Sequence, residues 1–222
     1  IEDQGENLTA IAVYGSAAGT DYSPKTSDIN LLVVCRKVGL ETLRKSLKTV
    51  DRGIRKKIAA PLFLTEEYIR RSADVFPIEF YDIKEKNLPV YGPDICSEIE
   101  IDPRNLRHQC EEEIKGKLIR IRQAYLEVGL KRKGIKALLK ESLTSLAPVF
   151  ANLLRLKGIA PPRRKEEIFK ELEITFGVES AVFIDIAKDK KNDEKIGSEE
   201  VELFLDTYLR NLEKLSRAVD EL

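Results

Sequence analysis

The residues best suited to chemistry stand at the ends of two apolar runs early in the chain. Gly15 and Ser16 follow the run at residues 10–14, and Asp28 and Asn30 open a second run. Gly15 would let backbone approach a ligand closely, and Ser16 with the amides after it could open a short helix that favours anions. Asp28 and Asn30 are two residues apart, so on a strand both project from one face. This pattern suits Mg²⁺ carrying a nucleoside triphosphate.

The surrounding chain predicts alternating strands and helices. Residues 10–14 and 30–35 are expected to form neighbouring strands, joined by a turn-rich segment with Gly19, Asp21, Ser23 and Pro24. Helical spacing of apolar residues then predicts an amphipathic helix that covers one side of the sheet. Those apolar residues are Leu40, Leu43, Leu47, Val50 (or Asp51), Ile54 and Ile58. A short strand at 61–64, a short helix begun by Thr65, a strand at 76–83 and a turn at 87–93 are expected to follow.

The Val-Tyr-Gly-Ser and Ser-Asp-Ile-Asn motifs at residues 13–16 and 27–30 resemble those of DNA polymerase beta-type nucleotidyltransferases. In that superfamily Gly-Ser precedes, by roughly a dozen residues, a strand with two acids separated by an apolar residue. The chain looks most like small bacterial and archaeal members and kanamycin nucleotidyltransferase-like proteins. The matched stretch is residues 13–34, with a looser match to about residue 94. One departure is that Asn30 stands where the family has its second metal carboxylate.

The resemblance implies in-line attack of an acceptor hydroxyl on the alpha phosphate of a nucleoside triphosphate, with pyrophosphate as the leaving group and Mg²⁺ (or Mn²⁺) as cofactor. It implies that Gly15 and Ser16 hold the triphosphate and that Asp28 bridges two metal ions. Asn30 would be a neutral metal ligand in this scheme. An amide contributes no charge, so its presence predicts weaker stabilisation of the developing anion.

The resemblance also calls for a third carboxylate, and two residues of the expected strand at 76–83 compete for this role. Glu79 and Asp82 are an odd number of residues apart, so a regular strand points them to opposite faces. Glu79 is favoured because Ile78 and Phe80 would pack on the other side. It would bind the catalytic metal and take the proton from the acceptor, with Asp82 as the alternative.

Residues 101–222 are expected to be wholly helical. Apolar stripes at helical spacing predict four or five amphipathic helices in an antiparallel bundle. The three longest stripes contain Ile114, Leu118, Ile121 and Tyr125; Leu139, Leu143, Leu146, Phe150, Leu153 and Leu154; and Val201, Phe204, Leu205, Tyr208, Leu212, Leu215 and Val219. The predicted fold is therefore α+β: a nucleotidyltransferase domain at 1–100, with a mixed sheet flanked by helices, followed by a helical bundle domain at 101–222. Kanamycin nucleotidyltransferase-like proteins are similar in this order.

Composition narrows the classes of function. Lys and Arg total 38 and Asp and Glu total 38, and this balance argues against a nucleic-acid partner. No apolar run approaches the ~18 residues that span a bilayer, and no signal-peptide pattern opens the chain. The three cysteines lack metal-ligand spacing, so a reduced, cytoplasmic setting is expected. His108 is the only histidine, and nothing around it suggests a catalytic triad.

Two classes of function follow. The first is an enzyme that transfers a nucleoside monophosphate to a hydroxyl on a small molecule or protein. The second is a catalytically weakened relative that acts as a regulatory or antitoxin-like interaction protein. Asn30 favours the second class, whereas Gly15, Ser16 and Asp28 favour the first. Proteins of this family often dimerise, so a homodimer is one expected assembly.

Overall fold

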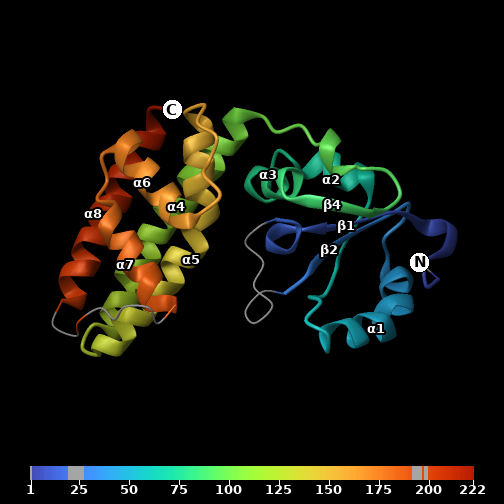
Figure 1. Cartoon of the computed structure of the whole chain (residues 1–222), viewed down its shortest axis with the longest axis horizontal. Helices are drawn as coiled ribbons and strands as arrows, with labels where there is room; N and C mark the ends of the chain where they lie inside the picture. The colour runs from blue at the N-terminus through green and yellow to red at the C-terminus, as the bar shows by residue number, and fades with distance from the viewer. Residues whose placement is uncertain (1, 20–27, 192–196, 198–199) are drawn as a thin grey trace. The chain divides into compact units, whose positions relative to one another are not determined.

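The computed structural model describes residues 2–19, 28–191, 197 and 200–222 (Figure 1). The chain divides into two compact units, residues 1–102 and residues 103–222. The described part of the first unit contains four strands and three α-helices, and that of the second contains five α-helices. The class is therefore α+β. No helix in the described ranges is long and apolar enough to cross a membrane.

A four-stranded mixed sheet forms the centre of the first unit. Its strands are β1 (Leu8–Tyr14), β2 (Asn30–Cys35), β3 (Leu62–Leu64) and β4 (Asn87–Tyr91). Their order across the sheet is β3-β2-β1-β4. β1 pairs antiparallel with both β2 and β4, and β2 pairs parallel with β3. The two predicted strands that carry the chemistry are thus direct neighbours at the centre of the sheet.

One face of this sheet carries the larger core of the unit. Ala10, Ala12, Leu32 and Val34 on β1 and β2 pack against helices α2 (Glu66–Ser72) and α3 (Pro77–Glu85). These helices contribute Ile69, Phe80 and Ile83 to the same cluster, and Ala73 joins it directly after α2. Thr65 begins α2 as predicted, because its side chain accepts a hydrogen bond from the amide of Tyr68. This core holds β1 and β2 in register up to their shared end at Tyr14 and Asn30.

The segment predicted as a strand at 76–83 is instead helix α3, so that prediction is wrong. Pro77 occupies the first turn, where its missing amide hydrogen costs nothing. Buried residues Pro77, Phe80 and Ile83 recur at intervals of three, which is the spacing of a helix face. The apolar residues Ile78 and Phe80 imitated strand alternation.

The predicted turn at 87–93 is also wrong, because residues 87–91 form β4. This strand lies at the edge of the sheet, where Pro89 is tolerated because an edge strand leaves half of its amides unpaired. Gly92 ends it with a φ of 73°. The turn chemistry of Asn87, Pro89 and Gly92 therefore marks the limits of an edge strand.

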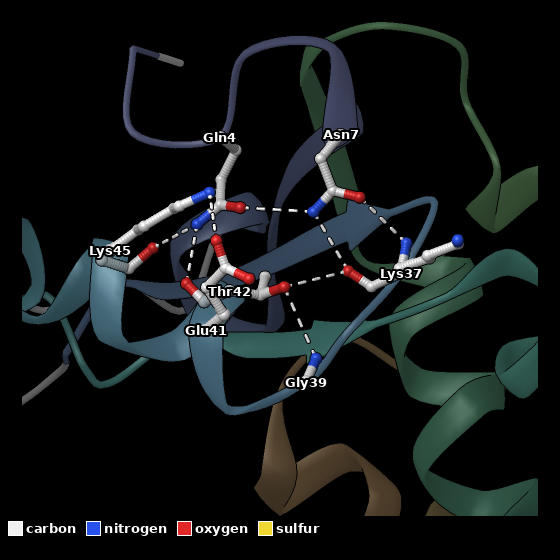
Figure 2. Close-up of polar contacts among 8 residues, drawn as sticks. Gln4, Asn7, Lys37, Gly39, Glu41, Thr42 and Lys45 are labelled. Carbon is white, nitrogen blue, oxygen red and sulfur yellow. Dashed lines mark hydrogen bonds and ion pairs between the residues drawn. The ribbon is translucent and has the colours of Figure 1, made fainter.

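Helix α1 (Leu40–Ile54) forms as predicted, but its apolar stripe does not cover the sheet. Leu40, Leu43, Leu47 and Ile54 are exposed, and Ser46 is the buried residue of the helix. Figure 2 shows why. The side chain of Gln4 binds the polar face of α1 through hydrogen bonds, and that of Asn7 binds Lys37 in the segment that leads into the helix.

The second unit consists of α4 (Pro103–Val128), α5 (Arg132–Leu156), α6 (Lys165–Phe176), α7 (Ser180–Lys191) and α8 (Val201–Asp220). The long helices α4 and α5 lie side by side, and α8 packs on both (Figure 1). The predicted stripes are largely buried, with Ile114, Leu146 and Leu212 fully so. An aromatic cluster of Phe150, Phe169, Phe183 and Tyr208 joins α5 to α8 at the centre.

A buried hydroxyl pair within this core provides a test of its packing. Tyr208 Oη and Ser142 Oγ are 2.9 Å apart and both residues are buried. Tyr208→Phe leaves the serine hydroxyl without this partner, so we expect a loss of about 1–2 kcal/mol of unfolding free energy, measured by urea denaturation. Ser142→Ala should cost a similar amount. The double variant should cost less than the sum, and strict additivity would contradict the pairing.

Candidate functional site at the end of strand β1

Gly15 ends β1 in a backbone conformation that favours glycine. Its φ is 75°, and its amide donates a hydrogen bond of 2.9 Å to the carbonyl of Lys86, which follows α3. A Cβ placed on Gly15 would lie 3.4 Å from Nδ2 of Asn30. The predicted glycine therefore lies directly against the predicted amide side chain.

Three side chains share one face of the sheet beside Gly15. Tyr14 is the pairing partner of Asn30 on β2 and of Asn87 on β4. Residues directly opposite each other on antiparallel strands project from the same face. This face is the one that carries the larger core, so the apolar packing gives way here to one phenol and two amides. Burial raises the pKa of Tyr14, which keeps its hydroxyl protonated at neutral pH.

Asp28 joins this face through the chain just before β2. Ile29 makes a parallel bridge with Ile58: its amide donates to the carbonyl of Lys57 and its carbonyl accepts from the amide of Ala59, both at 2.9 Å. Asp28 and Asn30 flank this extended residue, so strand alternation still favours a shared face for their side chains. Asp28 is exposed and Asn30 is half-buried. We call Tyr14, Gly15, Asp28, Asn30 and Asn87 the Gly15 edge.

Ser16 lies in the short 3-10 helix η2 (Gly15–Ala18), so the helix expected after the glycine is present. Ser16 is half-buried, and its carbonyl accepts a hydrogen bond of 3.2 Å from the amide of Gly19. The remainder of the predicted turn, including Asp21, Ser23 and Pro24, lies outside the described residues.

The two candidates for the third carboxylate lie on α3. Glu79 is exposed and Asp82 is half-buried. Three residues apart on a helix, they are neighbours on its surface. The argument that a strand points them to opposite faces is therefore wrong, so the preference for Glu79 loses its basis and both residues stay candidates. Asp82 lies one turn before Lys86, whose amide binds the Asp82 carbonyl at 3.0 Å and whose own carbonyl binds Gly15.

The Gly15 edge has one carboxylate, that of Asp28. It therefore suits a single metal ion that arrives bound to a nucleotide better than a metal centre held by three carboxylates. Within the described ranges, no group of three or more His, Cys, Asp or Glu side chains is placed to hold a metal. Mg²⁺ is commonly bound by one or two carboxylates together with substrate phosphates. Asp28, with the amide oxygen of Asn30, fits that smaller set.

Asn87 is a candidate residue that the sequence interpretation missed. Its Nδ2 donates to the carbonyl of Lys84 at 3.0 Å, but its Oδ1 is buried and has no hydrogen-bond partner among the described residues. A buried acceptor without a partner costs free energy, so a donor from a ligand at this edge would relieve it. The available signal was an asparagine two residues before a proline, which the sequence interpretation assigned to a turn.

Cysteine chemistry is disfavoured in this protein. Cys35, Cys96 and Cys110 are buried and free. Burial raises the pKa of Cys96 to about 11 and that of Cys110 to about 12. Both thiols therefore stay protonated at neutral pH, where only the thiolate is an effective nucleophile.

Comparison with known proteins leaves the Gly15 edge as the main guide to function. No model of a known protein family matches the chain, and no curated protein matches it significantly.

Proposed function

We propose that the first unit is a nucleotidyltransferase that binds a nucleoside triphosphate at the Gly15 edge. The observation that carries this proposal is the contact between Gly15, in its positive-φ conformation, and Asn30. This contact joins the Gly-Ser motif of β1 to the Asp-Ile-Asn motif of β2. A backbone free of side chain thus lies beside an amide, in the motif that also carries the carboxylate of Asp28, a combination suited to phosphate oxygens and their cation.

The reaction proposed for this edge is nucleotidyl transfer to a hydroxyl group. The acceptor oxygen bonds to the alpha phosphorus, the bond from that phosphorus to the bridging oxygen breaks, and pyrophosphate leaves with the electron pair. Because the amide of Gly15 already binds Lys86 and the amide of Gly19 binds the carbonyl of Ser16, the triphosphate is held by the Ser16 hydroxyl. Asp28 and Asn30 would hold Mg²⁺, which neutralises phosphate charge when bound. Asp82 or Glu79 takes the acceptor proton.

The proposal predicts metal-dependent stabilisation by nucleotides. At a ligand concentration of 100 times Kd, binding stabilises the folded state by about 2.7 kcal/mol, which raises Tm by several degrees. We expect this shift in the full chain with at least one of ATP, GTP, CTP and UTP in the presence of Mg²⁺. Asp28→Asn should abolish it, because the one carboxylate beside Asn30 is lost.

The matched control is Asp74→Asn, which neutralises another exposed aspartate of the same unit. This variant should keep the full nucleotide shift. If no nucleotide shifts Tm with or without Mg²⁺, or if both variants lose the shift equally, binding at the Gly15 edge is ruled out.

A second candidate function is a nucleotide-responsive regulatory or antitoxin-like protein. Two observations favour it: Asn30 replaces a carboxylate of the family pattern, and the described residues contain no acidic metal cluster. The helical unit would then be the contact surface for a partner. A set of acceptors with free hydroxyl groups distinguishes the two functions. If the chain binds nucleotide but releases no pyrophosphate with any of these acceptors, the regulatory function is supported and nucleotidyl transfer is contradicted.

A further inference from the structure

Helix α1 is attached to its own chain through a polar face. Nε2 of Gln4 donates to the carbonyl of Thr42 at 2.8 Å and to Oγ of Ser46 at 2.9 Å. The hydroxyl of Thr49 donates to Asp3 at 2.6 Å. Figure 2 shows the first of these contacts beside those of Asn7 and Lys37 at the start of the helix. They fix the rotation of α1 about its axis.

This attachment turns the apolar residues of α1 outward. The exposed fractions are 64% for Leu40, 41% for Leu43, 62% for Leu47 and 56% for Ile54. Val50 is half-buried beside them. We call these five residues the apolar seam. A contiguous row of large apolar side chains in water is a feature of interaction surfaces.

The spacing of the seam identifies the kind of partner that it fits. Successive members are separated by three, four, three and four residues. This is the a/d pattern of a coiled coil, narrower than the stripe of a helix that packs on a sheet. Leu40, Leu47 and Ile54 then occupy the a positions, and Leu43 and Val50 occupy the d positions. Arg44 and Asp51 occupy the e positions on one side of the seam. Ser46 occupies a g position on the other side, where Gln4 binds the helix. The seam therefore fits another helix with the same pattern.

We propose that the seam pairs with α1 of a second copy of this chain, in antiparallel orientation. When Leu47 is placed opposite Val50 of the partner subunit, Leu43 falls opposite Ile54 of the partner subunit. The same register places Arg44 opposite Asp51 of the partner subunit, twice by symmetry. A parallel pair would instead place Arg44 beside Gly39 and Asp51 beside Ser46 of the partner subunit, and both of these residues are uncharged. Asp51 already binds Arg55 of its own helix at 2.7 Å, an exposed pair that the contact with Arg44 would share or replace. Charge complementarity on this side favours the antiparallel dimer.

The test is the mass of the full chain in solution, measured by sedimentation velocity from low micromolar to submillimolar concentration. We expect the mass to rise toward twice the 25.2 kDa of one chain. Leu47→Glu should raise the dimer Kd by about 100-fold, because each of the two central layers, Leu47 against Val50 of the partner subunit and its symmetry mate, then carries a charge. The control is Leu203→Glu on α8, since Leu203 has nearly the same exposed fraction, 64%. It should leave the dimer intact.

Charge reversal tests the orientation. Arg44→Glu or Asp51→Lys alone should weaken the dimer, whereas the double variant should restore it, because both pairs are then reversed. A chain that stays monomeric throughout, or a dimer unaffected by Leu47→Glu, would overturn the proposal. A monomer that cosediments with phosphatidylserine vesicles would also overturn it, and would assign the seam and the basic residues Lys45, Lys48 and Arg52 to a lipid surface instead.

Discussion

Replacing Asn30 by aspartate should raise the rate of pyrophosphate release by about 100-fold, if nucleotidyl transfer is the reaction. Nδ2 of Asn30 lies against Gly15, and strand alternation places Asp28 on the same face as Asn30. An aspartate has nearly the same shape, so the variant adds a negative charge with little change in packing. That charge strengthens the hold on a cation that neutralises the phosphates, and a factor of 100 corresponds to about 2.7 kcal/mol.

The control for this variant is Asn30→Leu, which keeps the approximate volume of the side chain but removes its oxygen. This variant should release pyrophosphate more slowly than the native chain and should lose part of the metal-dependent nucleotide shift. Both rates are read by a coupled pyrophosphate assay, with Tm as the check on folding. If Asn30→Asp binds nucleotide more tightly but releases no more pyrophosphate, the regulatory function is supported and transfer is contradicted.

The spacing of apolar residues predicted the helices and strands of this protein best where an element buries a continuous apolar face. The helices of the second unit have long apolar faces at helical spacing, and β1 and β2 are apolar runs of ordinary strand length. In α3 the local signals conflicted, because Ile78 and Phe80 alternate like a strand whereas Pro77 suits a helix start. Tertiary packing of Phe80 and Ile83 into the core of the first unit decided the outcome.

Two features depended on contacts that no local pattern contains. The apolar stripe of α1 predicted that this stripe packs on the sheet. Instead Gln4, which is far away in sequence, binds Thr42 and Ser46 on the polar face of the helix. At the Gly15 edge, Gly15, Asp28 and Asn30 were recognisable from their motifs. Asn87 was not, because its role depends on the edge strand that places it opposite Tyr14.

Gly92 carries the largest steric constraint of the first unit among the described glycines. Its φ is 73°, and an added Cβ would lie 2.2 Å from the carbonyl oxygen of Thr9 and 3.1 Å from Cα of Ala10. Both are backbone atoms of β1, close to the irregularity in its pairing with β2 between Leu8 and Ala10. Backbone at the centre of a sheet cannot rotate away as a flexible side chain can.

Gly92→Ala should therefore destabilise the first unit by about 2–5 kcal/mol, from about 1–2 kcal/mol of left-handed strain and about 1–3 kcal/mol of steric displacement. Gly5→Ala isolates the first contribution, because Gly5 has a φ of 50° and nothing within 4 Å of the added Cβ. It should cost about 1–2 kcal/mol. Hydrogen exchange followed by mass spectrometry separates the effects, since peptides of β1 and β4 should lose protection in Gly92→Ala while those of α4 and α5 keep it. Equal losses in the two variants would show that β1 yields to the added carbon. The close packing of β4 on β1, which brings Asn87 beside Tyr14, would then not depend on Gly92.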